Sequence, residues 1–415
     1  MTAKDRLLTE ILRTAIYSKE FYIDKSVADS INWEEIYKEA RAHQVHTLIY
    51  PVIKQVDPSM GPDDKLMAVW NISVMSCGIQ MICDEIWLGE VIENLAAAGI
   101  DSIVLKGMAI NKCYPYPELR TMGDADILVH EEDMVRAAEV LERLGYFGQR
   151  DTKTKHIEFF KKNSITIELH RLLIDYDFMR YKESFHDEIW KNRVSVNLGT
   201  IKANILSWEM QILHICIHMA SHISHGGFGL RQLCDLVIVT EAKRNEINWN
   251  IVRDRSIKYG IDNFVYAIFL ACNRIFEMEV PPEIAFRSIR EHGKIDKLIE
   301  DILAGGNMGR KDIYRTSANV LLNNSSTGGE LKYRSKFSKA VHLLFPDRNK
   351  LVKRKKYMYV RRTPLFLPLA WMHRIAYGVK RKDFSFHDKK EIFRNSELNL
   401  MAEERNNLLE WLGLR

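Results

Sequence analysis

The segments that decide the fold are I-V-L-K-G (residues 103–107), R-T-M-G-D-A-D-I-L-V (residues 120–129) and S-I-T-I-E-L-H (residues 164–170). The first predicts a short apolar strand that ends in a Lys-Gly turn, with a helix after it. The second predicts a buried strand, because three apolar residues follow its acidic start without interruption. Residues two apart in a strand share a face, so Asp124 and Asp126 are expected side by side.

Three carboxylates are expected to converge from two of these strands. The third segment is also predicted to be a strand, with Glu168 and His170 on one face. Mg²⁺ favours carboxylate oxygens combined with substrate phosphates. Two such ions about 4 Å apart would clamp the attacking and leaving oxygens of a phosphoryl or nucleotidyl transfer. The pattern therefore predicts a metal site. The alternative is a pair of solvated acids at a strand end and an unrelated glutamate.

The ordered set of motifs resembles a known group of enzymes. A Lys-Gly turn, a helix, G-D-x-D on a strand and a later strand acid are similar to the DNA polymerase β-like nucleotidyltransferase superfamily. More narrowly, L-K-G, R-x-x-G-D-x-D-x-L-V and x-E-L-H resemble a bacterial family known mainly as uncharacterised nucleotidyltransferases. The match covers about residues 100–175. Weaker similarities follow at R-Q-L-C-D (231–235), G-G-N-M-G-R (305–310) and L-F-P (344–346).

The resemblance implies roles for individual residues. Asp124 and Asp126 would bind the Mg²⁺ or Mn²⁺ that carries the triphosphate. Glu168 would share a second ion and help to deprotonate the acceptor hydroxyl. Transfer of this kind needs little beyond positioning and charge neutralisation. The NTP, ATP by preference, would be contacted by a further group of residues: Lys106, Gly107, Arg120, Gly123 and His170.

The turn departs from the superfamily pattern, which usually has Gly-Ser or Gly-Gly there. Here Lys106 precedes Gly107 and Met108 follows it. A catalytically degenerate nucleotide-binding or interaction module is therefore the main alternative to an enzyme. Lys106 and Arg120 are the nearest cations for a triphosphate or pyrophosphate. For each the alternative role is a surface salt bridge, and for His170 it is a structural histidine.

A second group of candidate residues lies on the helices predicted after residue 207. His214, His218 and His222 recur every four residues and so share a helix face. One interpretation is a zinc site, although the H-E-x-x-H signature is absent, and the other is a polar pocket or a helix interface in which the histidines are hydrogen-bonded. Arg231 and Asp235 are also four apart. They either pair with each other or line an acceptor-side cleft between sheet and helices.

Composition is typical of a soluble globular protein, with 46% hydrophobic and 28% charged residues. Six scattered cysteines without a C-x-x-C motif are expected to be reduced core residues of a cytoplasmic protein. The N-terminal segment has no apolar core, so we expect no signal peptide. We also expect no transmembrane helix, and Trp70, Met75, Met81 and Trp87 should form the core stripe of a long helix over residues 62–98.

Charge is unevenly distributed. Residues 332–382 contain 16 Lys or Arg and one acid, whereas the remainder contains 44 cations and 54 anions. This basic stretch is interleaved with aromatic residues. Three interpretations are open. The stretch binds RNA, or it lies on an anionic membrane surface, which would make the protein peripheral to the membrane, or it packs against the acidic body. An RNA-directed nucleotidyltransferase is thus a further alternative.

The expected fold is α+β, with a small mixed nucleotidyltransferase sheet flanked by N-terminal and C-terminal helical regions. The regions are an N-terminal helical region (1–98), the nucleotidyltransferase core (99–180), a helical acceptor-side domain (181–304), a loop or boundary (305–330) and a basic C-terminal region (331–415). The expected reaction is Mg-dependent transfer of a nucleoside monophosphate from an NTP to a hydroxyl or phosphate. The acceptor would be a small molecule, a natural product or a peptide.

Overall fold

The computed structural model describes residues 1–28, 30–148, 156–173, 178–199, 201–285, 292–306, 366–380 and 396–415. The chain has two compact units, Met1–Ile313 with Asn407–Arg415, and Tyr314–Asn406. Apart from Gly305 and Gly306, the predicted boundary 305–330 lies outside the described residues. So does the basic stretch, except for residues 366–380, which include the helix α17 (Leu367–Lys380). The subdivision of residues 1–304 stays a prediction.

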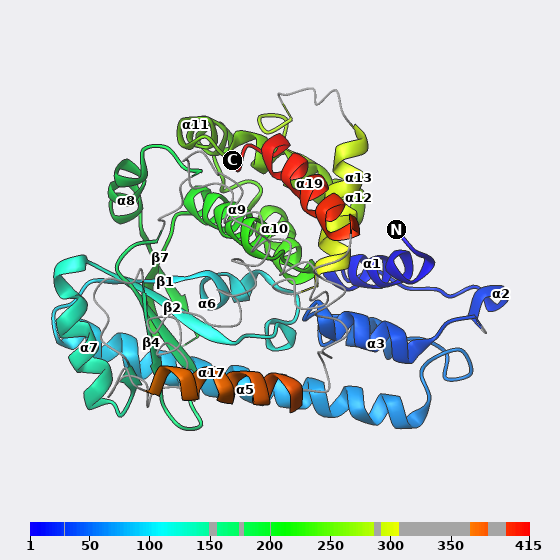
Figure 1. The fold of residues 1–415 in the computed structure, drawn as a ribbon, viewed down its shortest axis with the longest axis horizontal. Coiled ribbons are helices and arrows are strands. Elements are labelled where there is room, and N and C mark those ends of the chain that lie inside the picture. Colours follow the sequence, from blue (N-terminus) through cyan, green and yellow to red (C-terminus); the bar gives the residue numbers. More distant parts are fainter. Residues whose placement is uncertain are drawn as a thin grey trace. The chain divides into compact units, whose positions relative to one another are not determined.

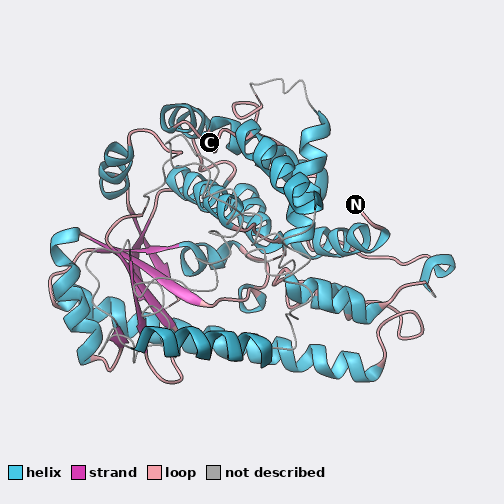
Figure 2. Cartoon of the chain, viewed as in Figure 1, coloured by secondary structure: helices cyan, strands magenta, loops and turns pink. Residues whose placement is uncertain are grey.

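The first unit contains a seven-stranded mixed sheet surrounded by helices, which confirms the α+β expectation (Figures 1 and 2). Its strand order is β3-β4-β5-β2-β1-β7-β6. Neighbours are parallel in the pairs β2–β5 and β1–β7 and antiparallel elsewhere. The strands are β1 (Ser102–Leu105), β2 (Asp124–Val129), β3 (Phe147–Gly148), β4 (His156–Phe160), β5 (Thr166–His170), β6 (Val194–Leu198) and β7 (Ile201–Ile205).

The hairpin β6–β7 is a part of the sheet that sequence analysis missed. Its residues V-S-V-N-L and I-K-A-N-I alternate apolar and polar side chains around Gly199, which is the usual signal of a hairpin. Gly199 has φ +61°, a conformation that glycine adopts without steric cost. Because β7 pairs in parallel with β1, the hairpin extends the sheet beyond the strand that leads into the Lys-Gly turn.

The two faces of the sheet pack against different parts of the protein. Side chains alternate between the two faces along each strand. Ile127, Ile167 and Phe159 point to one face, where they are buried against the long helix α5 (Asp64–Ala97) and α7 (Met134–Arg143). Ile103 and Leu128 belong to the other face. They share a core with the helices that follow β7, among them α9 (Trp208–His225) and α10 (Leu230–Lys243), which we call the helical body. The acidic residues of β2 and β5 occupy this second face, so the helical body lies opposite them.

Capping residues set many of the helix boundaries. Asn32 and Ser207 accept hydrogen bonds from backbone amides three residues on, as their sequence context predicts. Other helices in the described residues are α1 (Ala3–Ile16), α2 (Lys25–Ala28), α3 (Trp33–Ala42), α4 (Tyr50–Ile53), α6 (Lys106–Ile110), α8 (Lys182–Lys191), α9 (Trp208–His225), α10 (Leu230–Lys243), α11 (Trp249–Tyr259), α12 (Asp262–Phe276), α13 (His292–Gly305) and α19 (Ser396–Trp411). Three short 3₁₀ turns, η1 (Asn111–Cys113), η2 (Pro117–Leu119) and η3 (Glu131–Asp133), join strands and helices around β2.

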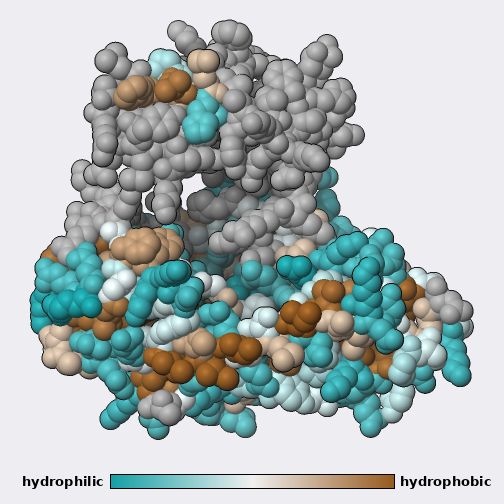
Figure 3. Space-filling view, turned by 90° about the horizontal axis from the view of Figure 1, so that it is seen from below, coloured by the Kyte–Doolittle hydropathy of each residue, from teal (hydrophilic) through white to brown (hydrophobic). Residues whose placement is uncertain are grey.

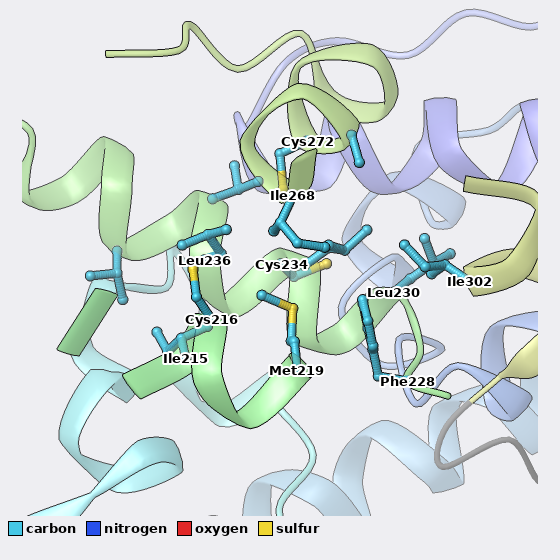
Figure 4. Close-up of a cluster of buried hydrophobic side chains, with 14 of the residues drawn as sticks. Ile215, Cys216, Met219, Phe228, Leu230, Cys234, Leu236, Ile268, Cys272 and Ile302 are labelled. Atoms are coloured by element: carbon cyan, nitrogen blue, oxygen red, sulfur yellow. The ribbon is translucent and has the colours of Figure 1, made fainter. Parts of the chain in front are cut away.

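The helical body is built on an apolar core between α9, α10 and α12 (Figure 4). Cys216, Cys234 and Cys272 lie within it, fully buried, and all six cysteines are free thiols. The prediction of reduced cysteines is therefore confirmed, and three of them belong to the core. This packing fixes the positions of α9 and α10 relative to each other, and both helices contribute to the site described below.

The helix α5 departs from expectation in two respects. Of its predicted core stripe, Trp70 is buried but Met75 is 61% exposed, and it lies among other exposed apolar residues: Val69, Ile72, Ile79, Ile82 and Ile86. Figure 3 views the molecule from the side of α5 and shows hydrophobic side chains gathered on this face. By length and composition alone α5 is able to cross a membrane. The expectation that no such helix exists overlooked the uncharged run at residues 66–83.

Candidate nucleotidyltransferase site

The site begins at the turn between β1 and α6. Lys106 occupies this turn with φ +47°, a left-handed conformation that is uncommon outside glycine. The turn reverses the chain as β1 ends, and it brings the Lys106 ammonium to the second strand: its Nζ lies 3.0 Å from Oδ1 of Asp126. The residue that departs from the superfamily pattern is therefore an ion-pair partner of a predicted metal ligand.

Strand register brings the acids together. In the parallel pair β2–β5, Asp126 lies opposite Glu168 and Asp124 lies opposite Thr166. Since neighbouring strands are about 4.8 Å apart, opposed side chains on one face are in reach of a common ligand. His170 follows on the same face and contacts both acids. Its Nε2 lies 2.7 Å from Oδ1 of Asp126 and 3.3 Å from Oε2 of Glu168.

Lys106 and His170 both contact the buried acid at the centre of the site, Asp126. Burial alone would raise the pKa of Asp126, but Lys106 and His170 outweigh it and hold the pKa well below its usual value. The pKa of Lys106 rises in turn, because attraction to Asp126 and Glu168 overcomes its burial. The pKa of His170 is raised in the same way, chiefly by its hydrogen bond to Asp126. Asp126 is therefore charged at neutral pH.

Asp124 is in a different electrostatic position at the start of β2. Burial, reinforced by repulsion from Asp126 and Glu168, raises its pKa to about 6. Among the described residues, no cation lies within hydrogen-bonding distance of Asp124. Asp126, by contrast, has Lys106 at that distance. A cation bound beside Asp124 would relieve the repulsion from Asp126 and Glu168.

A pocket of about 470 Å³ collects every predicted site residue. This volume lies within the usual range of small-molecule sites. The sheet, the β1–α6 turn and helices α9 and α10 supply its walls. Ten of its lining residues were predicted from sequence: Lys106, Gly107, Arg120, Gly123, Asp124, Asp126, Glu168, His170, Arg231 and Asp235. The structure thus brings together residues that are spread over 130 positions of the chain.

Arg120 and Asp235 pair with each other, which corrects two alternatives raised by sequence. Nε and Nη2 of Arg120 donate to the two carboxylate oxygens of Asp235 at 2.8 and 2.9 Å, and Tyr114 donates to Oδ1 at 2.6 Å. All three side chains are buried. The local pair between Arg231 and Asp235 is not formed, and Arg231 instead donates to the carbonyl of Thr121. Arg120 is not a surface salt bridge either.

The geometry also explains why residue 107 is a glycine. A Cβ at this position would approach Nη1 of Arg120 to 2.9 Å and Sδ of Met122 to 3.0 Å. The guanidinium, held by Asp235, therefore occupies the space that a side chain would need. By contrast, a Cβ at Gly123 would meet nothing within 4 Å, so Gly123 leaves open space at the pocket rim.

Four histidines line the pocket in addition to His170. His214, His218 and His222 of α9 face it, as the polar-pocket alternative predicted, and Nε2 of His218 lies 3.0 Å from Nε2 of His222. Burial, with repulsion from Lys106, lowers the pKa of His218 well below its usual value, so its imidazole is neutral. The fourth, His156 of β4, was missed, although its position opposite His170 follows once β4 and β5 are paired.

The donor set suits a hard divalent cation. Mg²⁺ takes carboxylate oxygens from the protein and fills its other positions with water and phosphate. Asp124, Asp126 and Glu168 offer such oxygens on one wall of the pocket, and the remaining volume accommodates a ligand. The carboxylates themselves repel phosphate, so a cation bound to them would be needed, together with Lys106, to neutralise a polyphosphate in the pocket.

Comparison with known proteins gives matches at the level of family and structure. Residues 29–277, more than half of the chain, match the family described as uncharacterised nucleotidyltransferase. No curated protein matches the chain. A solved structure, an antigenic nucleotidyltransferase-like protein from Paracoccidioides brasiliensis, is similar at 12% identity and a TM-score of 0.31. That alignment covers 49% of this chain and 97% of the other.

The matched residues, 29–277, include all ten predicted site residues, which lie between Lys106 and Asp235. They also include the strands and helices that line the pocket. The match by itself does not assign those residues a role. It identifies the chain, over the part that forms the pocket, as a member of the uncharacterised nucleotidyltransferase family.

Proposed function

We propose that this protein transfers a nucleoside monophosphate from an NTP, ATP by preference, to a hydroxyl or phosphate oxygen of a small-molecule or peptide acceptor. The acceptor oxygen forms a bond to the α-phosphorus, the bond from that phosphorus to the bridging oxygen breaks, and pyrophosphate leaves. A hydroxyl acceptor gives up its proton to a base in the pocket. On its motifs, we also propose that the chain belongs to a bacterial family within the DNA polymerase β-like nucleotidyltransferase superfamily.

The observation that carries the proposal is the set of three carboxylates on one sheet face, beside a turn and inside a pocket. Asp124, Asp126 and Glu168 would hold Mg²⁺ or Mn²⁺. Such an ion supplies charge neutralisation for the triphosphate and for the leaving pyrophosphate. Glu168 is the candidate base, because it lies next to the pocket volume and is less enclosed than Asp126, with 18% of its side chain exposed against 5%.

Lys106 and Arg231 are the cations available to phosphate groups. Lys106 pairs with Asp126 in this structure, and its ammonium lines the pocket, so an incoming phosphate would compete for it. Arg231 is half-buried, and its pKa is lowered first by burial and then by Arg120. A bound anion would relieve both effects. Arg120 plays a different part, since Asp235 already neutralises it.

The acceptor would enter from the helical side. Helices α9 and α10 form the wall opposite the sheet, and the histidines of α9 provide polar groups among apolar ones such as Ile217 and Met219. A site of this kind recognises a small molecule or a peptide end through a few polar contacts and shape. Arg231 would contact the acceptor directly. Asp235 would act only indirectly, by positioning Arg120.

Turnover tests the proposal directly. The protein is incubated with each of the four NTPs, labelled at the α-phosphate, with Mg²⁺ or Mn²⁺ and a small-molecule extract. Release of pyrophosphate together with transfer of the label to a new product is expected. Glu168→Gln should abolish transfer, whereas Glu158→Gln, which changes the exposed acid directly opposite on β4, should leave it intact. Equal activity of the two variants would remove Glu168 from the reaction.

A second function is favoured by one observation, the ion pair between Lys106 and Asp126. An internal cation at this carboxylate is what a degenerate, nucleotide-binding module would use in place of a metal. In that case NTP would bind without divalent ions, and Lys106→Ala would restore metal dependence or abolish binding. An RNA-directed reaction through the basic stretch, and a peripheral location in the cytoplasm, remain separate proposals that gel shift and liposome sedimentation would test.

A further inference from the structure

We infer that His156, Glu168 and His170 form a site for a divalent transition metal of the Mn²⁺ or Zn²⁺ class. One ligand atom from each of the three residues lies within 4.8 Å of the others. Oε2 of Glu168 is 3.3 Å from Nε2 of His170 and 4.0 Å from Nε2 of His156. The two imidazole rings have centroids 5.0 Å apart. This arrangement leaves room for an ion that contacts all three.

The cluster is built on regular strands, so its geometry follows from strand pairing. In the antiparallel pair β4–β5, His156 lies directly opposite His170. Glu168 lies two residues before His170 and therefore shares its face. Ligands held on paired strands keep their spacing better than ligands on loops. Two short strands therefore specify the proposed ligands. One of them, β4, carries His156, which local sequence patterns do not single out.

The chemistry of the donors selects the metal. Mg²⁺ takes oxygen ligands, whereas imidazole nitrogen suits transition metals such as Zn²⁺ and Fe²⁺. Two imidazoles and one carboxylate also leave coordination positions open, as in catalytic rather than structural sites. Those positions face the pocket, because all three residues line it. A phosphate oxygen of a ligand in the pocket would therefore be able to complete the coordination.

Charge at the cluster points to the same conclusion. Nε2 of His170 stands between Asp126 and Glu168, at 2.7 and 3.3 Å. A divalent ion beside this nitrogen would attract both carboxylates and would recruit His156 as a further ligand. Asp124 at the start of β2 stays free for a second ion with oxygen ligands only.

This inference deepens the proposed function, on which it rests only because Glu168 belongs to both sites. It divides the metal requirement into two unlike positions. One has carboxylate oxygens near Asp124 and suits Mg²⁺, and the other has two nitrogens and one carboxylate. The prediction is that Mn²⁺ or Zn²⁺ binds without nucleotide, at a site that Mg²⁺ does not compete for effectively.

The test is metal binding by full-length protein purified without a polyhistidine tag. Mn²⁺ binding is measured by EPR titration, and pulsed EPR detects ¹⁴N modulation from coordinated imidazole. Wild-type protein should bind one Mn²⁺ with nitrogen modulation. His156→Ala and His156→Gln should weaken binding of this nitrogen-coordinated Mn²⁺ at least tenfold and reduce the modulation, while the pocket variant His218→Ala should keep both. Zn²⁺ content after dialysis should follow the same order.

Three outcomes separate this inference from the proposed function. Nitrogen-coupled Mn²⁺ without nucleotidyl transfer from any NTP would keep the metal site and reject the function. Mg-supported transfer by the His156 variants, combined with bound Mn²⁺ that lacks nitrogen modulation, would keep the function and overturn the metal site. Loss of binding in His218→Ala with retention in both His156 variants would move the site to α9 and overturn the inference as well.

Discussion

Replacing Asp235 with asparagine should destabilise the protein more than any single change to a surface ion pair. Asp235 accepts three hydrogen bonds, two from Arg120 and one from Tyr114, between 2.6 and 2.9 Å. The Arg120 side chain is only 3% exposed. Asparagine keeps one acceptor oxygen but leaves the guanidinium buried without its counter-charge. Breaking a buried pair in this way costs about 3–5 kcal/mol.

The measurement is urea unfolding followed by far-UV circular dichroism. A matched control is Lys38→Gln, which breaks the pair between Lys38 and Glu34, whose side chains are 72% and 71% exposed. An exposed pair within one helix is worth about 0.3–0.5 kcal/mol, so the control should change stability little. A double replacement of Arg120 and Asp235 by apolar residues of similar size should recover much of the loss. A cost below about 1 kcal/mol for Asp235→Asn, by comparison with the range for buried pairs, would refute the buried pair.

Three further predictions concern packing and pH. Gly107→Ala should cost about 1–3 kcal/mol, as overpacking does, and weaken nucleotide binding in calorimetry, because the new Cβ displaces Arg120; unchanged binding would contradict this. Asp84→Asn should stabilise the protein above pH 6 but not below pH 4 in urea titrations. Burial raises the pKa of Asp84 to about 6, so its charged form opposes folding as the pH rises through that range. An effect that does not depend on pH would contradict this prediction. Trp70→Ala should cost about 3–5 kcal/mol, against at most about 0.5 for Ile82→Gln on the exposed face of the same helix; similar losses would show that this face is covered.

Local patterns were sufficient for the strands that carry the acids. Asp124, Asp126 and Glu168 were placed correctly on strand faces because side-chain alternation is a property of each strand by itself. The adjacency of Asp126 and Glu168 also required the parallel pairing of β2 with β5, which sequence analysis did not specify. The ten predicted residues all line one pocket, although their roles in binding and catalysis stay predictions.

Long-range pairing was beyond the reach of local patterns. Arg120 and Asp235 are 115 residues apart, and Asp235 has a nearer cation in Arg231, so spacing favoured the wrong partner. His156 was missed for a similar reason: it begins a strand, and its importance appears only when β4 is paired with β5. For α5, apolar residues occupy both faces, and periodicity does not tell which face is buried.

The measurement that tests the central claim most directly is nucleotide binding by the metal-ligand variants. Titration calorimetry compares a non-hydrolysable ATP analogue with wild-type protein, the double variant Asp124→Asn/Asp126→Asn and the control Glu158→Gln, each with Mg²⁺ and with EDTA. We predict binding by wild type and control only with Mg²⁺, and no binding by the double variant, which should retain its circular dichroism spectrum. Unchanged Mg²⁺-dependent affinity in the folded double variant would contradict the assignment of this site.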